Sequence, residues 1–261
     1  MSRKLGQHFL INDSAIKKII AALDLRENDT IVEIGPGTGA LTLPLARQCQ
    51  ISNFKCQIIV VEKDKVLAKN LAGKLPHVRV IANDILKILP TLVIDLKLKI
   101  KNFKLVGNIP YYITGKLLRI LSELAKKPEL IVITIQKEVA ERLMVQAPKM
   151  NLLAAAVQIW AKPEIIGCLK PGDFDPPPKV DSTIVKLTPK APILDDRKLA
   201  EYFKLIKLIF KQPRKTLLNN LSTGLKVSKN EALEILKKAG LNGDERPQNL
   251  TINTIIKLLT F

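Results

Sequence analysis

The chain has 261 residues, of which 47% are hydrophobic, and its mean hydropathy of +0.12 is typical of a globular protein with one large core, or one core and a smaller domain. No apolar run is long enough to span a bilayer and no apolar signal segment follows the first residues, so we expect a cytoplasmic protein without a membrane partner. The formal net charge of +18 at pH 7 predicts a polyanionic partner, and nucleic acid is favoured because no basic amphipathic segment carries large aromatic residues.

Apolar segments rich in valine and isoleucine alternate with helix-like segments through the first half of the chain. This alternation predicts a doubly wound α/β fold with a mostly parallel, Rossmann-like sheet. The expected strands are residues 30–34, 57–62, 78–82, 104–107 and 130–135. The expected helices are residues 40–48, 65–74, 115–125 and 137–146.

The first expected strand runs into three glycines at alternate positions, Gly35, Gly37 and Gly39. Glycine is favoured there because the turn needs unusual dihedral angles and because the backbone must approach a ligand closely. The spacing predicts a cradle for a nucleotide-type cofactor, although Gly35, Gly37 and Ala40 also satisfy the relaxed dinucleotide fingerprint. A carboxylate at Glu33 would repel a pyrophosphate and suits a cationic ligand such as S-adenosylmethionine.

Acidic residues follow the next two expected strands. Glu62 closes the second strand and Asp84 follows the third. In a doubly wound sheet, ligands bind beyond the carboxyl ends of the strands, so both side chains are expected in the same crevice as the glycines. Glu62 could accept both ribose hydroxyls and Asp84 could accept a hydrogen bond from an adenine amine. Either residue alone could instead be an exposed loop acid.

The fourth expected strand ends in the motif Asn108, Ile109, Pro110 and Tyr111, which we predict to be catalytic. An aromatic amine is a poor nucleophile, so its methylation needs acceptors that draw the nitrogen toward tetrahedral geometry. The Asn108 side-chain oxygen and the carbonyl of Ile109, held by Pro110, would supply them, and Tyr111 could stack on a base that has left its own stack. The alternative is a structural proline turn with a core tyrosine.

The second half of the chain changes character. Residues 155–166 and 180–187 flank a proline-rich stretch and could add a pair of strands to the sheet. Beyond residue 189 the apolar spacing is helical. We therefore predict a cofactor-binding catalytic domain over residues 1–189 and a helical domain over residues 190–261. The expected helices of the second domain are residues 197–210, 214–221, 229–239 and 251–259.

These motifs resemble those of the small-subunit ribosomal RNA adenine dimethyltransferases and, more distantly, those of the erythromycin-resistance rRNA methyltransferases. The resemblance runs nearly end to end, and its later segments are more similar to the ribosome-biogenesis branch. The segments that carry it are residues 6–10, 32–42, 61–64, 83–85, 107–111, 136–143, 174–182 and 213–217.

The resemblance implies a class I methyltransferase that uses S-adenosylmethionine to dimethylate the exocyclic amine of two adjacent adenosines near the 3′ end of small-subunit (16S) rRNA during ribosome biogenesis. The implied partner is the assembling small ribosomal subunit, and we expect the enzyme to act as a monomer. The opening motif of the family has an asparagine where this chain has His8, which leaves that side-chain contact open. The residues implied at the cofactor site are His8, Leu10, Gly35, Glu62, Asp84 and Asn108.

The predicted helical domain contains fourteen Lys or Arg and seven Asp or Glu, a net charge of +7. Lys211, Arg214 and Lys215 place three of these cations within five residues at an expected helix start. We predict that they bind folded rRNA, although such a run can also be only a solvated face.

Three other functions remain open: a resistance-type rRNA methyltransferase, a dinucleotide-dependent oxidoreductase and a non-catalytic assembly factor. A metal site is not expected. The cysteines make no C-x-x-C pair and the two histidines, His8 and His77, lie far apart in the sequence.

Overall fold

The structure is a computed structural model that describes residues 7–51, 55–94 and 103–259. The chain divides into two compact units. The first contains Met1–Ala140 and Pro163–Pro189, and the second contains Glu141–Lys162 and Lys190–Phe261. The expected division after residue 189 differs from this in one segment, because Glu141–Lys162 groups with the helical unit.

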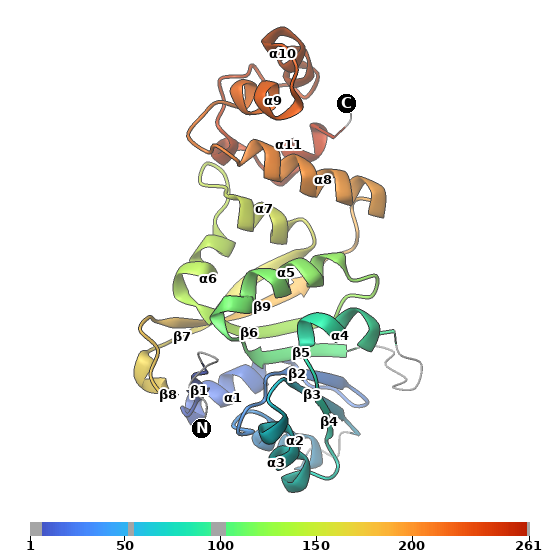
Figure 1. The fold of residues 1–261 in the computed structure, drawn as a ribbon, viewed down its shortest axis with the longest axis vertical. Coiled ribbons are helices and arrows are strands. Elements are labelled where there is room, and N and C mark those ends of the chain that lie inside the picture. The colour runs from blue at the N-terminus through green and yellow to red at the C-terminus, as the bar shows by residue number, and fades with distance from the viewer. Residues whose placement is uncertain (1–6, 52–54, 95–102, 260–261) are drawn as a thin grey trace. The chain divides into compact units, whose positions relative to one another are not determined.

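The first unit is built on a seven-stranded sheet with the order β4-β3-β2-β5-β6-β9-β7 (Figure 1). Strands β2 to β6 run parallel, and β9 is antiparallel to β6. The order reverses between β2 and β5, which is the position where a doubly wound sheet forms its ligand crevice. The strands are β2 Thr30–Ile34, β3 Gln57–Glu62, β4 Arg79–Ala82, β5 Phe103–Asn108, β6 Leu130–Gln136, β7 Ala161–Leu169 and β9 Ser182–Pro189.

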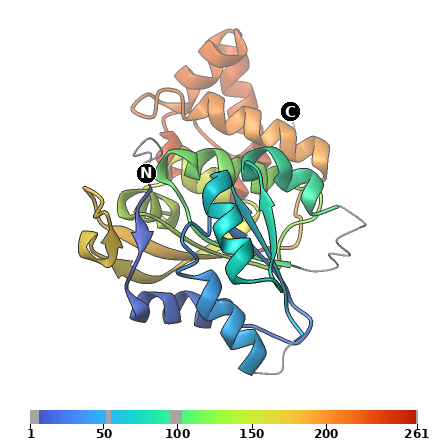
Figure 2. The ribbon, with the colours of Figure 1, turned by 60° about the horizontal axis from the view of Figure 1, so that its bottom comes forward.

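Helices cover both faces of the sheet. One core cluster joins apolar residues of α1, α2 and α3 to alternate residues of the strands, such as Ile58 and Val60 of β3. Figure 2 shows α1 and α2 on one side of the sheet and α5 on the other. Successive strand residues point to opposite faces, so strands buried on both sides are apolar throughout. The helices are α1 Asp13–Ala22, α2 Thr42–Ile51, α3 Lys65–Lys74, α4 Ile85–Leu92, α5 Thr114–Glu123 and α6 Lys137–Met144.

A second, two-stranded sheet fastens the N-terminal segment. Strand β1 (Phe9–Leu10) pairs antiparallel with β8 (Phe174–Asp175). Just beyond it, Asn12 caps α1 by accepting a hydrogen bond from the Ala15 N–H and donates its Nδ2 to Asp173 at 2.6 Å. Segments more than 160 residues apart in the chain are therefore held side by side.

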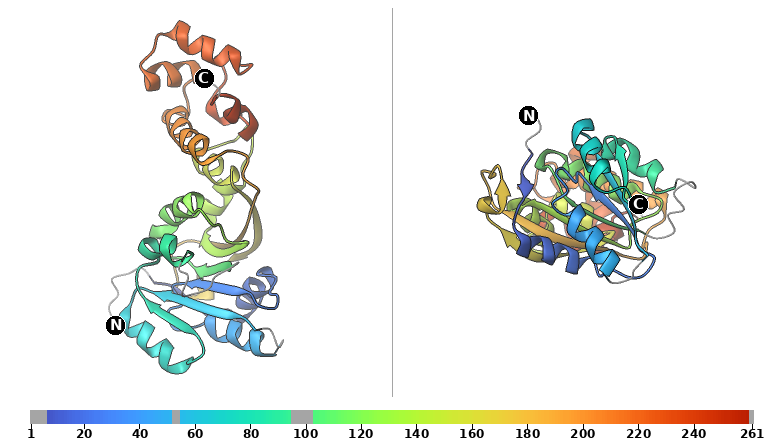
Figure 3. Two further views of the ribbon diagram at one scale, coloured as in Figure 1. Left: turned by 90° about the vertical axis from the view of Figure 1, so that its right-hand side faces the viewer. Right: turned by 90° about the horizontal axis from the view of Figure 1, so that it is seen from below.

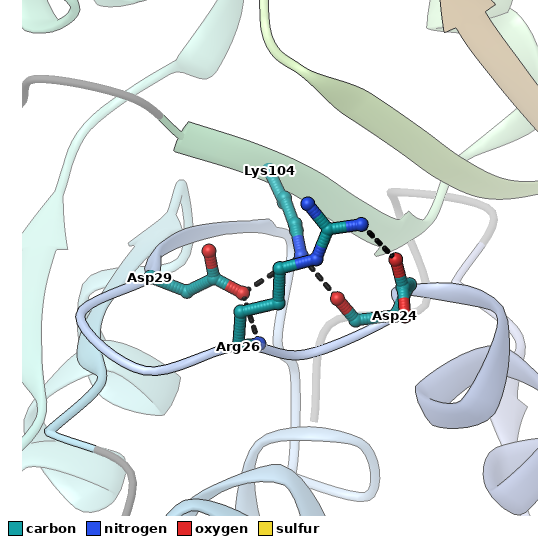
Figure 4. A network of polar contacts seen from close by, with 4 residues as sticks. All are labelled: Asp24, Arg26, Asp29 and Lys104. Atoms are coloured by element: carbon teal, nitrogen blue, oxygen red, sulfur yellow. Dashed lines mark hydrogen bonds and ion pairs between the residues drawn. The ribbon is translucent and has the colours of Figure 1, made fainter.

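A buried ion pair ties the start of β5 to the loop that precedes β2 (Figure 4). Lys104 is 3% exposed, and its Nζ lies 2.7 Å from Asp29 Oδ2 and donates to the carbonyl of Asp24. Arg26 forms a second, exposed ion pair with Asp24. Because β2 and β5 are parallel neighbours, this network lies at the amino-terminal edge of the sheet, opposite the edge at which β5 ends in Asn108.

The second unit is helical (orange to red for its C-terminal part in Figure 3). Tyr202 of α8 is fully buried and donates its hydroxyl hydrogen to the carbonyl of Ala155 in α7 at 3.0 Å, so the two helices pack together. The helices are α7 Leu152–Gln158, α8 Asp196–Ile209, α9 Leu217–Leu225, α10 Lys229–Lys238 and α11 Ile252–Lys257.

Two sequence predictions of local structure are wrong. Residues 155–166 were expected to be a strand, but α7 occupies the first part of that range and β7 begins only at Ala161. Asn151 starts α7 by accepting a hydrogen bond from the Ala154 N–H. Arg214 was expected inside a helix, but α9 begins after its cap residue, Thr216, so residues 211–215 form the turn between α8 and α9.

Among the described residues, the structure contains neither a membrane-spanning helix nor a metal-binding cluster. Within residues 7–51, 55–94 and 103–259, no helix has the length and apolar character needed to cross a membrane. The same residues contain no group of three or more histidine, cysteine or acidic side chains arranged to hold a metal ion.

Candidate active site

One cavity lies at the carboxyl ends of β2, β3, β4 and β5, all within the first unit. The loops after these four strands and the N-terminal segment line it. This is the position that the switch in strand order predicts for a ligand. The candidate residues that line the cavity are His8, Gly35, Gly37, Glu62, Asp84, Asn108, Ile109, Pro110 and Tyr111.

The glycine loop has the backbone conformation that glycine alone adopts easily. Gly35, Gly37 and Gly39 have φ angles of +63°, +56° and +89°. A Cβ at Gly35 would meet no atom within 4 Å, so the backbone there is open to a ligand. A Cβ at Gly37 would lie 2.6 Å from Cε1 of Phe9, because the phenyl ring of the N-terminal segment packs on this glycine.

Glu62 presents a fixed carboxylate to the cavity. The residue is 3% exposed and is the last of β3. Its Oε2 accepts a hydrogen bond from the Gly37 N–H at 3.0 Å, and its Oε1 accepts one from the Asp64 N–H at 2.8 Å. Each oxygen keeps a further lone pair, so the carboxylate can accept two more hydrogen bonds, as a ribose diol would require.

Asp84 lies at the start of α4, where its Oδ1 accepts a hydrogen bond from the Leu86 N–H at 3.0 Å. Its Oδ2 lies 3.1 Å from Nζ of Lys63, which is largely exposed. Partial burial raises the pKa of Asp84, but the hydrogen bonds from Lys63 and Leu86 and the positive charges of Lys63 and Lys87 outweigh it, so the pKa lies below its usual value. The carboxylate is therefore ionised at neutral pH.

Glu33 does not offer the cavity the negative charge that the sequence interpretation gave it. The residue is 2% exposed and does not line the cavity. Burial raises the pKa of Glu33 to about 8, and the negative charge of Glu62 adds to the rise. A carboxyl group that is mostly neutral at pH 7 gives little electrostatic attraction to a sulfonium, so the reasoning that used Glu33 to choose the cofactor fails.

Asn108 ends β5, and its amide has a defined orientation. The Nδ2 group donates a hydrogen bond to the carbonyl of His8 at 2.7 Å. A carbonyl can only accept, so the Asn108 side-chain oxygen is left as the free acceptor. The next residue, Ile109, is anchored by a hydrogen bond from its N–H to the carbonyl of Thr134 at 3.1 Å.

Tyr111 begins the short 3₁₀ turn η3 (Tyr111–Ile113) and is held at both ends. Its hydroxyl lies 2.7 Å from Oγ of Ser182, a buried residue of β9. Its ring faces the imidazole of His8, with a centroid separation of 6.0 Å and an interplanar angle of 25°. A tyrosine fixed in this way, and only partly buried, presents an aromatic surface at the cavity rather than filling the core.

Some candidate residues lie outside the cavity lining. Leu10 is buried in the core, Gly39 packs on Leu71, and Glu33 lies within β2. The exposed turn with Lys211, Arg214 and Lys215 belongs to the second unit.

Sequence reasoning gave no role to the side chains of Phe9, Lys63 and Ser182. Phe9 and Ser182 fall within segments that carry the family resemblance, 6–10 and 174–182. Their spacing carries no sign of the contacts that they make with Gly37 and Tyr111.

The cavity fits an adenosine-containing cofactor. An open glycine backbone, a buried carboxylate at Glu62 and an ionised carboxylate at Asp84 offer acceptors for hydroxyl and amine groups at successive strand ends. Glu62 also occupies the Gly37 N–H, which takes away a donor that a pyrophosphate would need. The acceptor-rich lining therefore favours S-adenosylmethionine over a dinucleotide.

Comparisons with known proteins also favour a methyltransferase that uses S-adenosylmethionine. A family model described as Ribosomal RNA adenine dimethylase matches residues 1–259. The chain is 41% identical over 252 residues to Ribosomal RNA small subunit methyltransferase A of Dehalococcoides mccartyi (strain ATCC BAA-2266 / KCTC 15142 / 195), covering 95% of this chain and 84% of the relative. The protein of the same name from Alkaliphilus oremlandii is 36% identical and covers 96% and 88%.

Two solved structures share the fold over nearly the whole chain. A dimethyladenosine transferase from Plasmodium falciparum has a TM-score of 0.79 at 25% identity, covering 96% of both chains. The 23S rRNA methyltransferase ErmE has a TM-score of 0.72 at 26% identity, covering 97% of this chain and 98% of that one. The predicted α/β fold and cofactor are confirmed, and the oxidoreductase alternative is wrong. The chain belongs to the ribosomal RNA adenine dimethylase family, whose members are methyltransferases that use S-adenosylmethionine.

Proposed function

We propose that the enzyme dimethylates the exocyclic amines of two adjacent adenosines near the 3′ end of small-subunit (16S) rRNA. The observation that carries the proposal is the arrangement of Asn108 and Tyr111 in one cavity, with an oriented amide oxygen beside an aromatic surface. The choice of the small subunit rests on the names of the relatives at 36–41% identity.

The target base enters this pocket only after it leaves its own stack. Tyr111 then stacks on the base, while the side-chain oxygen of Asn108 and the carbonyl of Ile109 accept hydrogen bonds from the amine. These acceptors draw the nitrogen lone pair out of conjugation with the ring and stabilise the positive charge that develops there. The methylated amine releases its proton to solvent, so no residue acts as a strong base.

Glu62 and Asp84 hold the cofactor in this proposal. Glu62 accepts hydrogen bonds from the ribose hydroxyls, and Asp84 accepts one from the adenine amine. When bound, S-adenosylmethionine supplies an electrophilic methyl group. The contribution of the protein is to position the two reactants and to provide polar stabilisation.

The proposal includes the cellular setting. The enzyme acts in the cytoplasm as a monomer on the assembling small subunit, whose phosphates its charge of +18 complements. The direct test is mass spectrometry of rRNA from cells with and without the gene. Loss of dimethyladenosine from the small-subunit rRNA is expected. Loss from the large-subunit rRNA would instead support the resistance-type alternative. That alternative is included because the 23S rRNA methyltransferase ErmE has a similar structure.

The site is tested by Asn108→Ala. Losing one polar stabiliser should reduce methyl transfer to small ribosomal subunits roughly a hundredfold. Binding of S-adenosylmethionine, measured by calorimetry, should change little. Tyr111→Phe is the matched control, because it keeps the ring and loses only the hydroxyl contact with Ser182.

Two results would contradict this assignment. If cofactor affinity falls in proportion to turnover, Asn108 acts on the cofactor rather than on the base. If Asn108→Ala keeps full activity, methyl transfer depends on the non-polar shape of the pocket and not on its hydrogen-bond acceptors.

A further inference from the structure

The side chain of Tyr111 meets a buried hydroxyl group at its outer end. Its hydroxyl oxygen lies 2.7 Å from Oγ of Ser182, which is the first residue of β9 and is 0% exposed. Ser182 is not among the described residues that line the cavity. Any effect of Ser182 on a base in the cavity therefore passes through Tyr111.

The strand order explains why a residue of β9 reaches this edge of the sheet. Strand β9 runs antiparallel to β6, and Ser182 is paired with Gln136, the last residue of β6. The start of β9 therefore lies beside the carboxyl ends of the parallel strands, where the cavity is found. The contact joins residues 71 positions apart in the chain.

Two neighbouring strands thus hold the segment that carries Tyr111. The N–H of Ile109 donates a hydrogen bond to the carbonyl of Thr134 in β6 at 3.1 Å, and the Tyr111 hydroxyl is held by Ser182 of β9. A phenol hydroxyl lies on the axis of its ring, so a hydrogen bond there selects one χ1 rotamer of the side chain. Rotation of the ring about its own axis leaves the bond intact. Ser182 therefore fixes the direction in which the Tyr111 ring extends.

We propose that Ser182 is a positioning residue for methyl transfer, whose hydroxyl holds the Tyr111 ring in the orientation that stacks on the target base. A base that enters the cavity then meets a ring that is already oriented, so less side-chain freedom is lost on binding. The inference rests on the proposed function, because it takes Tyr111 as the residue that stacks on the base.

The test compares Ser182→Ala with Tyr111→Phe, which removes the same hydrogen bond from the other side. Substrate is the small ribosomal subunit purified from cells that lack the gene. Each variant should lower kcat roughly threefold to tenfold, as the loss of one hydrogen bond implies. The KM for the subunit should stay within about twofold, because the phosphate contacts that supply much of the affinity for RNA are unchanged. These losses remain well below the roughly hundredfold loss expected for Asn108→Ala.

The double variant tests whether the two residues act through one bond. Because Ser182→Ala already removes that bond, adding Tyr111→Phe should lower kcat no further. Calorimetric titration with S-adenosylmethionine counts the folded sites, so that kcat is expressed per site and partial unfolding is not mistaken for loss of positioning. The affinity for the cofactor should change less than about twofold in all of these variants.

Thr183→Val is the matched control. Thr183 is the next residue of β9 and is 1% exposed, and its Oγ1 has no hydrogen-bond partner among the described residues. Successive strand residues point to opposite faces of the sheet, so this hydroxyl does not face Tyr111. Its replacement by a methyl group should leave kcat per site unchanged.

Three outcomes overturn the inference. If Ser182→Ala keeps the wild-type kcat per site while Tyr111→Ala is impaired, the base pocket stands but the ring does not need Ser182. If the losses of Ser182→Ala and Tyr111→Phe add in the double variant, the two residues act independently. If Tyr111→Ala itself keeps full activity, the role that the proposed function gives to Tyr111 fails, and the inference fails with it.

Discussion

At the scale of single residues, two buried carboxyl groups lie near the glycine loop, but only Glu62 lines the cavity. Its two hydrogen bonds from backbone N–H groups fix the carboxylate before any ligand arrives. Glu33 lies within β2 and is mostly neutral at pH 7, because burial raises its pKa to about 8. The same residue type therefore has a proposed binding role at position 62 and a cost to stability at position 33.

Glu62→Ala should weaken binding of S-adenosylmethionine on the order of tenfold to a hundredfold. The reason is the loss of hydrogen bonds to a charged group, which contribute about 1.5–3 kcal/mol each. Calorimetric titration of the variant measures the effect. Glu33→Gln is the control, since its side chain lies outside the cavity lining. Binding by Glu62→Ala within twofold of the wild type would remove Glu62 from the cofactor site.

Glu33→Gln should change how stability depends on pH. Burial holds the pKa of Glu33 in the folded protein at about 8, against 4.5 for a glutamate in water. An acid with a raised pKa is neutral in the folded state and ionised in the unfolded state between these two values. Its contribution therefore lowers the free energy of unfolding as pH rises from about 4.5 to about 8.

Urea unfolding of both proteins across this range measures the effect. Relative to the wild type, Glu33→Gln should gain stability as pH rises, with a difference on the order of 1–3 kcal/mol at pH 7. A difference that stays constant from pH 5 to pH 8 would show that Glu33 is ionised in the folded protein.

At the scale of elements, the ion pair between Lys104 and Asp29 joins β5 to the loop before β2. Lys104→Met should lower the free energy of unfolding by about 3 kcal/mol, because it leaves the Asp29 carboxylate, whose side chain is 11% exposed, without its ion-pair partner. The midpoint of urea unfolding measures this. Arg26→Ala is the matched control: it breaks the exposed pair with Asp24 in the same network and should leave the midpoint almost unchanged. Equal shifts for the two variants would contradict this account.

Local patterns predicted the strands and the glycine loop well. Burial on both faces gives a strand of consecutive apolar residues, and a positive φ favours glycine. Strands β2 and β3 have the predicted bounds. Helix α7 was missed because most of its residues are buried, which removes the polar face that reveals a helix. The bond between Asn108 and the His8 carbonyl joins residues 100 positions apart, and no local spacing encodes it.

At the scale of the whole molecule, basic charge is found in both predicted domains, so RNA binding should depend on more than the cavity. Lys211, Arg214 and Lys215 are exposed in the turn between α8 and α9. Replacing all three by Ala should weaken binding of the small ribosomal subunit and reduce its salt dependence by roughly 0.7–0.9 per lost phosphate contact. Affinity measured at several salt concentrations gives both values.

Cofactor binding is the internal control for this triple variant, because none of the three residues lines the cavity. Identical salt slopes for the variant and the wild type would take the turn out of the RNA footprint. The search would then move to the basic residues of the first domain.

The hydrogen bond from the Asn108 amide to the His8 carbonyl bears on which side chains residue 8 can have. Its acceptor is a main-chain carbonyl, which all twenty amino acids provide. A substitution at position 8 therefore keeps the orientation of the Asn108 amide as long as β1 stays paired with β8. The side chain at that position therefore does not determine which way the Asn108 amide is oriented. An amide or an imidazole at position 8 therefore leaves the Asn108 amide with the same main-chain acceptor.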